Sequence, residues 1–370
     1  MTESLRTAAL IYGPEGHHLD HLAPLCCLLD IPLLVTEESI FDIAKEFYPG
    51  LKVSYLDYLS IAEAIIKNYE VIIHCSVRAL FDEIFFFAQK LGNKKIHTIW
   101  CPHGNSDKGH STYYMEALAG EGLALVYGQK MIDFLKGKGV LDKLKGYAEV
   151  GNYRLTYYHM HKAFYERRII DKVAKKLPVR KKNILYAPTW NDFEHSSSFY
   201  DAISTLIERL PESYNLIIKL HPNLRLQDPF GVDKFMQSYE DRNQILFLED
   251  FPSIYPLLDF IDIYIGDASS IGYDILAFNK PMLLLNQNNR DCRTDPGLYL
   301  FQCGIEIRKE QYFDIYKILS AYLPSDVSYF TEVRKKVYEH TFGKEKSPGK
   351  LKEEIKALYK ELPDINLNFY

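Results

Sequence analysis

Short apolar runs alternate with segments of helical spacing along most of the chain, and this alternation constrains the fold more than any other feature. In the first half, the apolar runs lie at residues 7–12, 32–36, 53–56, 71–75, 96–101 and 123–127. Helical segments lie between them, including residues 17–29, 60–67 and 80–91. Strands that alternate with helices form a parallel sheet covered on both faces. The first half is therefore predicted to be doubly wound.

The second half restarts the same pattern. Its apolar runs lie at residues 184–187, 216–220, 245–248, 263–265, 282–285 and 305–307, and its helical segments at 200–210, 232–239, 312–322, 329–340 and 351–362. Two doubly wound, Rossmann-like domains that face a cleft form the GT-B arrangement, and C-terminal helices would close it. This α/β class is the fold that we predict.

The length of 370 residues suits two domains. A basic, aromatic segment at residues 153–177 has helical spacing, and Pro178 interrupts it. We therefore expect an N-terminal Rossmann-like domain at residues 1–152, a connecting helix and linker at 153–182, a C-terminal Rossmann-like domain at 183–345, and a closing helix and tail at 346–370.

The composition excludes several classes of protein. A net charge of −5 argues against a nucleic acid as the main partner. No apolar run is long enough to span a bilayer, and the N-terminus has no basic segment followed by an apolar one. None of the six cysteines forms a CxxC pair, so we expect reduced thiols in a cytoplasmic protein.

A polar turn follows the apolar run at residues 262–265. Asp267, Ser269 and Ser270 form this turn, and residues 271–278 have helical spacing. Free N–H groups at a helix N-terminus bind anions, and ligands of open α/β sheets lie at the carboxyl ends of strands. The turn is therefore either a phosphate site or a simple helix cap made by one of the serines.

His103 also follows an apolar run, within a turn that contains Pro102 and Gly104. An imidazole with a pKa near its free value of about 6.5 suits a general base. The alternative is a turn histidine bonded to the backbone. Asp107 follows four residues later and is a candidate to orient the ring.

Two further segments place polar groups at strand ends. Thr189 comes directly after a predicted strand and offers a hydroxyl and an N–H group. Lys219 and His221 project from the same side of a strand that Pro222 ends, which suits a phosphate clamp. The alternatives are a plain strand exit, a solvated lysine and a capped histidine. Asp250, or the preceding Glu249, follows another strand and is a further candidate for a ligand contact.

His17, His18 and His21 cluster at the start of the first helical segment. His17 and His21 have the i, i+4 spacing of zinc ligands, but the sequence shows no third ligand. We therefore expect no metal; His17 and His18 either line the first-domain side of the cleft, where a second substrate would bind, or are merely solvated. Residues 153–177 are either a helix that packs between the domains or one that rests on an anionic membrane surface.

Four motifs, in this order and spacing, carry a family resemblance. They are HGNSDKG from His103, YAPTW from Tyr186, KLHP from Lys219 and GDASSIGYD from Gly266. The set resembles the CDP-glycerol:poly(glycerophosphate) glycerophosphotransferase family of teichoic-acid-type polymerases and primases, from about residue 103 to residue 281. This chain differs from the family pattern at Asn191 and Ala268.

The resemblance implies an enzyme that moves a polyol phosphate, normally glycerol phosphate, from a CDP-activated donor to an acceptor hydroxyl and releases CMP. His103 would then be the base, and His221 with Lys219 would hold the donor pyrophosphate. Ser269, Ser270 and Thr189 would contact the phosphate oxygens. The acceptor would be lipid-linked or a glycan, with peripheral attachment to the inner membrane face, and no cofactor beyond the donor is expected.

Two other functions stay open on the sequence. One is a GT-B glycosyltransferase that uses a nucleotide sugar and releases a nucleoside diphosphate. The other is a non-catalytic nucleotide-binding module, which the difference at Asn191 favours and the presence of His103 and His221 disfavours.

Overall fold

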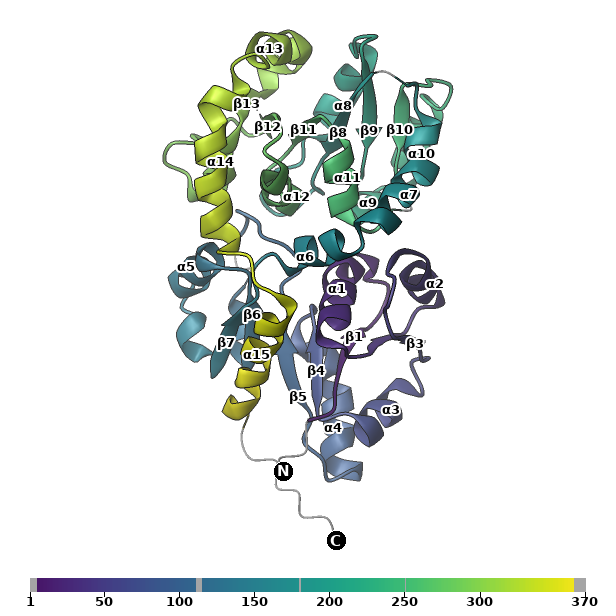
Figure 1. Cartoon of the computed structure of the whole chain (residues 1–370), viewed down its shortest axis with the longest axis vertical. Helices are drawn as coiled ribbons and strands as arrows, with labels where there is room; N and C mark the ends of the chain where they lie inside the picture. Colours follow the sequence, from purple (N-terminus) through teal and green to yellow (C-terminus); the bar gives the residue numbers. More distant parts are fainter. Residues whose placement is uncertain (1–4, 111–114, 180, 250, 363–370) are drawn as a thin grey trace. The chain divides into compact units, whose positions relative to one another are not determined.

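The predicted strands and helices form two separate parallel sheets, each in its own unit (Figure 1). The computed structural model describes residues 5–110, 115–179, 181–249 and 251–362. Unit 1 contains residues 1–103, 113–161 and 341–370, and unit 2 contains residues 104–112 and 162–340. The expected class of fold, GT-B with two doubly wound parts, is confirmed.

The sheet of unit 1 has seven strands in the order β3-β2-β1-β4-β5-β6-β7, and its pairs are parallel. The strands are β1 (Thr7–Ile11), β2 (Leu33–Val35), β3 (Val53–Tyr55), β4 (Val71–His74), β5 (His97–Trp100), β6 (Leu123–Val126) and β7 (Gly146–Glu149). The α-helices are α1 (Leu19–Leu29), α2 (Glu38–Phe47), α3 (Ile61–Asn68), α4 (Asp82–Leu91), α5 (Gln129–Gly137), α6 (Tyr153–Met160) and α15 (Pro348–Leu358). The central strands β1, β4, β5 and β6 are buried throughout, as expected for a sheet covered on both faces.

The sheet of unit 2 has six strands in the order β10-β9-β8-β11-β12-β13, again all parallel. The strands are β8 (Lys182–Ala187), β9 (Tyr214–Ile218), β10 (Ile245–Phe247), β11 (Ile263–Gly266), β12 (Met282–Asn286) and β13 (Ile305–Arg308). The α-helices are α7 (Lys162–Lys172), α8 (Phe199–Glu208), α9 (Pro222–Gln227), α10 (Pro229–Gln237), α11 (Ile254–Phe260), α12 (Ser270–Asp274), α13 (Ile315–Tyr322) and α14 (Asp326–Phe342).

Alternate residues of the unit 2 strands share one apolar core. Ile184 and Tyr186 of β8 pack there with Leu216 and Ile218 of β9, and with residues of α8 and α13. The period of two follows from the strand geometry, which turns successive side chains to opposite faces. Leu185 between them is also fully buried, so both faces of the sheet are covered.

Both sheets reverse their strand order at one point. In unit 1 the reversal lies between β1 and β4, and in unit 2 it lies between β8 and β11. Loops after strands on either side of such a point diverge and leave room for a ligand at the carboxyl edge. The strand order therefore selects the loops after β1 and β4 in unit 1 and those after β8 and β11 in unit 2; β5 and β9 are the next strands outward.

The chain divides at different positions from those we expected. The predicted helix at residues 153–177 is two helices, α6 and α7, which break at His161 and belong to different units. The division therefore comes after residue 161, earlier than the predicted break at Pro178. Residues 341–370 return to unit 1, whereas we had assigned residues up to 345 to the second domain.

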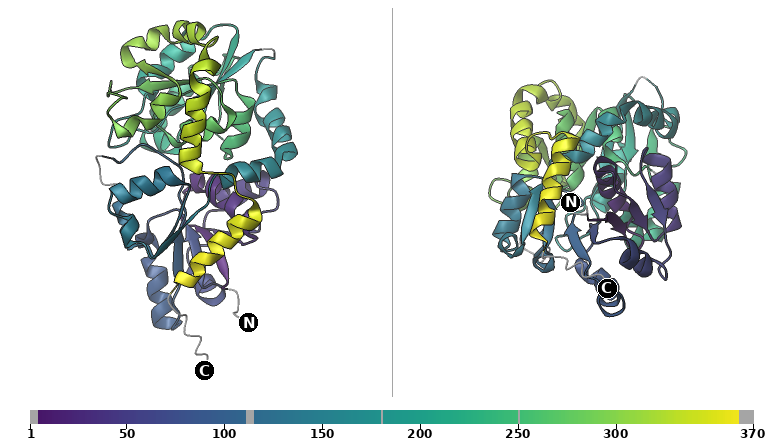
Figure 2. Two further views of the ribbon diagram at one scale, coloured as in Figure 1. Left: turned by 60° about the vertical axis from the view of Figure 1, so that its left-hand side comes forward. Right: turned by 60° about the horizontal axis from the view of Figure 1, so that its bottom comes forward.

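The C-terminal helix α15 explains this return. Its buried residues are Leu351, Ile355 and Leu358, and it packs on β7 and α1 of unit 1 (Figure 2). The Tyr359 hydroxyl, just after α15, lies 2.9 Å from the Thr7 hydroxyl of β1. The first and last elements in the described part of the chain thus belong to one unit.

The aromatic residues of α6 are part of the core of unit 1. Tyr153, Tyr157 and Tyr158 are each at most 3% exposed, and the Tyr157 hydroxyl donates to the Pro49 carbonyl at 3.0 Å. Packing, rather than a membrane surface, accounts for these side chains. None of the helices in the described ranges combines the length and apolar character that a membrane span requires.

Candidate active site

Three neighbouring strands of unit 2 bring the predicted donor-site residues to one edge of the sheet. β8 lies between β9 and β11. Thr189 follows β8, His221 follows β9, and Ser269 follows β11. Ring contacts join two of these loops, because the Trp190 and His221 ring centroids are 6.2 Å apart. Segments far apart in sequence therefore meet at the edge where α/β proteins bind ligands.

His221 caps the N-terminus of α9. Its Nδ1 accepts a hydrogen bond from the Asn223 N–H at 3.2 Å, and Pro222 occupies the first turn. Because Nδ1 is the acceptor, the neutral ring carries its proton on Nε2. That N–H is the type of group that donates to a phosphate oxygen.

Lys219 lies beyond the end of β9, so strand alternation does not place it as we predicted. β9 ends at Ile218. The Lys219 ammonium donates to the Phe251 carbonyl at 2.8 Å, and the side chain is half-buried. Lys219 and His221 thus share the loop after β9, but the ammonium is bonded to the loop after β10.

Ser269 and Ser270 open α12, which is shorter than predicted. The α-helix ends at Asp274, and a 3₁₀ turn, η6 (Ile275–Phe278), completes the predicted segment. Ser269 is the N-cap residue, but its side chain makes no cap hydrogen bond; its Oγ lies 3.3 Å from the Tyr264 hydroxyl. The simple cap that we considered for Ser269 is therefore not the structure found.

Gly104, next to His103 in sequence, lies close to this turn. Its φ is +135°, a backbone conformation that side chains disfavour, and a Cβ added there would lie 2.7 Å from the Ser270 Cβ. The glycine of the first motif is thus required for its close approach to the fourth motif within unit 2.

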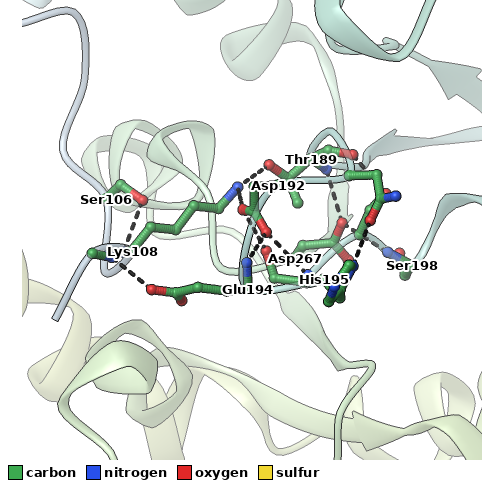
Figure 3. Close-up of polar contacts among 12 residues, drawn as sticks. Ser106, Lys108, Thr189, Asp192, Glu194, His195, Ser198 and Asp267 are labelled. Atoms are coloured by element: carbon green, nitrogen blue, oxygen red, sulfur yellow. Dashed lines mark hydrogen bonds and ion pairs between the residues drawn. The ribbon is translucent and has the colours of Figure 1, made fainter. Parts of the chain in front are cut away.

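Asp267 has a structural role rather than the ligand contact that we predicted. The side chain is fully buried, and its Oδ2 accepts from the Thr189 N–H at 2.8 Å and the Ser198 N–H at 3.2 Å. Asp267 thereby ties the loop after β11 to the loop after β8 (Figure 3). Within the described residues, its other oxygen has no hydrogen-bond partner, and burial raises the pKa of the carboxyl to about 6.

We predict that Asp267→Asn changes the pH dependence of unit 2. The folded carboxyl binds a proton at a higher pH than the unfolded one, whose pKa is about 4. Wild-type stability is therefore lost as the pH rises from about 4 to about 6, by up to about 3 kcal/mol. Asparagine does not titrate, so the variant should gain stability relative to wild type between pH 4 and pH 7. Urea unfolding at both pH values measures this.

Asp314→Asn, at an exposed N-cap of the same unit, is the control. If both variants show the same difference between pH 4 and pH 7, burial of Asp267 does not control the stability of unit 2.

Lys108 is a site residue that sequence reasoning did not assign. Its ammonium donates to the Thr189 hydroxyl and pairs with Asp192 Oδ2 at 2.5 Å, and the lysine and aspartate side chains are only 11% and 7% exposed (Figure 3). The N–H of Thr189 is bonded to Asp267, so only its hydroxyl proton is left for a ligand. Lys108 adds a cation beside that hydroxyl.

Two other candidates lie elsewhere. Both oxygens of Asp107 accept within unit 2, from the Tyr273 hydroxyl and from the Leu300 N–H at 2.9 Å. This gives Asp107 an anchoring role in unit 2, whereas His103 belongs to unit 1. Asp250 lies outside the described residues.

Four histidines gather at the carboxyl edge of unit 1. His17 and His18 are in a 3₁₀ turn after β1, η1 (Gly16–His18), and His103 follows β5. The His103 ring centroid is 5.0 Å from that of His18, 5.7 Å from His17 and 6.5 Å from His21. The structure thus brings His17 and His18 next to His103.

Burial keeps these imidazoles neutral. It lowers the pKa of His103 to about 4, with a further contribution from the proximity of His17. It also lowers the pKa of His17 to about 4 and that of His18 further, where His103, His17 and His74 add to the effect. The expectation of a pKa near 6.5 for His103 is therefore wrong. At neutral pH the ring is unprotonated and able to accept a proton.

His21 is held in the core and does not continue the cluster as a ligand. Its Nδ1 lies 2.8 Å from the Tyr127 hydroxyl, and its carbonyl accepts from the Tyr153 hydroxyl at 3.1 Å. The adjacent Asp20 accepts from buried Arg154 at 2.9 Å. These bonds fix α1 against α6 and so support the turn that carries His17 and His18.

Two doubly wound units, each with polar residues at its switch-point loops, define a protein of the GT-B class. Residues 159–303 match the family model described as CDP-Glycerol:Poly(glycerophosphate) glycerophosphotransferase. The segment contains the last three of the four motifs, and the resemblance to this family is confirmed. Thr189, Lys219, His221, Ser269 and Ser270 all lie inside the matched segment.

Curated relatives match about a third of the chain. The teichoic acid glycerol-phosphate primase of Bacillus subtilis (strain 168) is 35% identical over 124 residues, which are 32% of this chain and 29% of the primase. The teichoic acid ribitol-phosphate polymerase TarK of Staphylococcus aureus (strain NCTC 8325 / PS 47) is 28% identical over 142 residues, which are 36% of this chain and 26% of the polymerase. The matches thus span less than a third of these relatives.

Solved structures share the fold over nearly the whole chain. The wall teichoic acid polymerase TagF, soaked with CDPG, has a TM-score of 0.65 at 13% identity, covering 96% of this chain and 88% of that one. MnaA of S. aureus with UDP has a TM-score of 0.61 at 15% identity, covering 99% of this chain and all of that one. At such identities the likeness shows the fold.

Proposed function

We propose that the protein transfers a polyol phosphate from a CDP-activated donor to an acceptor hydroxyl and releases CMP. The observation that carries this proposal is the arrangement in unit 2. There, Thr189, His221 and Ser269 follow three adjacent strands inside the segment that matches the glycerophosphotransferase family. The relatives named as glycerol-phosphate primase and ribitol-phosphate polymerase support a polyol phosphate as the transferred group.

Unit 2 supplies the groups that would bind the donor. The His221 Nε2–H, the Thr189 hydroxyl and the hydroxyls of Ser269 and Ser270 are donors for phosphate oxygens. Lys219 and Lys108 place positive charge near them, which stabilises the charge that develops on the departing CMP. Phosphoryl transfer depends mainly on positioning and charge stabilisation, so this set is chemically sufficient.

Unit 1 supplies the base. We propose that neutral His103 removes the proton from the acceptor hydroxyl while the hydroxyl oxygen bonds to the donor phosphorus. The bond from that phosphorus to the bridging oxygen breaks, and CMP leaves with the electron pair. A pKa of about 4 keeps His103 unprotonated across the physiological range. The acceptor in this proposal is a lipid-linked or glycan hydroxyl.

A nucleotide panel tests the reaction class. The protein is incubated with CDP-glycerol, CDP-ribitol or UDP-glucose and a polyol-phosphate acceptor, and the released nucleotide is separated by chromatography. CMP release that depends on the acceptor supports the proposal. Release of UDP from the nucleotide sugar contradicts it, and so does nucleotide binding without turnover on any acceptor.

We predict that His221→Asn lowers kcat by about 10²–10³-fold, the usual effect of losing one donor to a developing oxyanion. Asparagine retains a side-chain oxygen that can accept from the Asn223 N–H, so the cap of α9 is preserved. It lacks the Nε2–H that we assign to the phosphate. CMP release under saturating donor measures the change.

His195→Ala, an exposed histidine in another loop of unit 2, is the matched control and should retain wild-type kcat. Equal activity of both variants would exclude His221 from the reaction.

A second candidate is a glycosyltransferase. Solved proteins of the same fold were obtained with UDP, namely MnaA and, at a TM-score of 0.59, HepE of Anabaena with UDP and glucose. The UDP in these two structures is what raises this candidate, whereas the higher TM-score of TagF and the family match over residues 159–303 favour the phosphotransferase. The released nucleotide in the panel above separates the two.

A further inference from the structure

Three histidines, His17, His18 and His103, form a cluster in the loops after β1 and β5 of unit 1. One nitrogen each from His17, His18 and His103 lies within 4.8 Å of the other two. The sequence suggested His17 and His21 as a pair and showed no third ligand. In the structure His21 is bonded to Tyr127, and His103 joins His17 and His18 instead.

We propose that His17, His18 and His103 bind a divalent transition-metal ion of the zinc class. Zinc–nitrogen bonds of about 2.0–2.1 Å place the nitrogens of a tetrahedral site about 3.4 Å apart. The three nitrogens lie within 4.8 Å of one another, so binding an ion would draw them together by up to about 1.4 Å. Three histidines and one open position form a known catalytic zinc arrangement.

Unsatisfied ring atoms are the second observation for this site. In the described part of the chain, Nδ1 of His18 and Nδ1 of His103 are buried and have no hydrogen-bond partner. Buried polar atoms are almost always satisfied, so two such atoms in one cluster indicate a missing water or ion. A metal ion satisfies several lone pairs at once, and the neutral rings are in the form that binds it.

The surroundings resemble the outer shell of a metal site. Glu15 Oε2 lies 3.3 Å from His17 Nδ1, which leaves the other nitrogen of His17 for a metal. Carboxylates often hold metal-binding imidazoles in this way. The cluster itself offers nitrogen only, which favours zinc, cobalt or nickel over magnesium or calcium, since those two prefer oxygen ligands.

A metal at this position would act on a bound hydroxyl. An ion with one open position lowers the pKa of a coordinated water or alcohol. The base role proposed above for His103 belongs to the ion-free protein; with an ion bound, the three rings would hold it and the proton of a coordinated hydroxyl would pass to solvent. The metal proposal does not rest on the proposed transferase activity, because binding of the ion is measured without donor or acceptor.

Cobalt provides the direct probe. The protein is dialysed against a chelator and titrated with Co²⁺ alone, and the visible absorption of tetrahedral cobalt is recorded; Zn²⁺ is then titrated by calorimetry. We expect saturation at one ion per chain. His18→Ala should weaken binding by about 100-fold or more, and Glu15→Gln by about 10–100-fold. His159→Ala, on the exposed surface of α6, should bind as wild type does.

The variant His17→Cys tests the site even if His18→Ala loses metal binding only because it does not fold. A thiolate keeps the ligand count, so this variant should still bind Co²⁺ and should add a sulfur-to-cobalt charge-transfer band. That band supports the site even if His18→Ala does not fold. The proposal is overturned if wild type shows no saturable Co²⁺ spectrum, or if folded His18→Ala binds with unchanged affinity and His17→Cys adds no band.

Discussion

Alanine at position 103 is expected to lower the rate of CMP release by about 10²–10⁴-fold, the usual contribution of a positioned base. His103 is the member of the histidine cluster that also belongs to the family-like motif series. Affinity for CDP should be unchanged, because the groups that we assign to the donor lie in unit 2 and His103 lies in unit 1. Chromatographic assay of CMP and calorimetry with CDP measure the two quantities separately.

The control for this variant is His97→Ala. His97 is also buried, and it lies at the opposite end of the same strand, β5. Removal of its ring reports the effect of losing a buried imidazole from unit 1 without touching the cluster. Turnover near the wild-type rate in His103→Ala, with turnover equally retained in His97→Ala, would remove His103 from the mechanism.

The strands were predictable where they are buried on both faces. Runs such as residues 71–75 and 216–220 are mostly apolar, and this pattern identified the buried strands β4 and β9 to within a residue or two. The edge strand β7 was missed, because only Ala148 of its four residues is buried and the sequence there has little apolar character.

The return of residues 341–370 to unit 1 could not be predicted in the same way. The spacing of Leu351, Ile355 and Leu358 predicts a helix with one apolar face. It does not say which sheet that face covers, since both sheets present apolar surfaces. The break at His161 could not be predicted either, because the residues on both sides of it favour a helix.

The site was predictable where it follows from one rule, that ligands of open α/β sheets bind at the carboxyl ends of strands. Thr189, His221 and Ser269 each follow a strand, and the structure places those strands side by side. Lys108 was missed because a lysine in a polar loop resembles any solvated lysine until its partner Asp192 is known. Asp267 was assigned to a ligand because a turn aspartate next to serines usually faces solvent, whereas this one is fully buried.

The largest effect on stability is expected at Arg334 of α14. Its guanidinium donates to both oxygens of Asp326 at 2.7 Å and to the Cys303 carbonyl at 2.8 Å, and the two side chains are 1% and 3% exposed. Arg334→Ala leaves the Asp326 carboxylate buried and unpaired, which typically costs about 3–5 kcal/mol. Urea unfolding should therefore shift to a much lower midpoint.

The two tryptophans allow unit 2 to be followed alone. Trp100 lies in unit 1 and Trp190 in unit 2, and the sequence contains no others. In a Trp100→Phe background, fluorescence reports the unfolding of unit 2, which avoids treating a two-unit protein as one transition. Arg334→Ala should shift this signal and leave His103-dependent metal binding in unit 1 intact.

Two further variants test whether the loss of stability comes from the buried ion pair, rather than from the loss of any ion pair. Lys309 pairs with Asp201 on the surface of unit 2, with both side chains at least 40% exposed, so Lys309→Ala should cost less than about 1 kcal/mol. The double variant Arg334→Met, Asp326→Leu removes both buried charges and should be more stable than Arg334→Ala, because no carboxylate is left unpaired. If Arg334→Ala costs no more than Lys309→Ala, the buried pair of Arg334 and Asp326 does not stabilise unit 2.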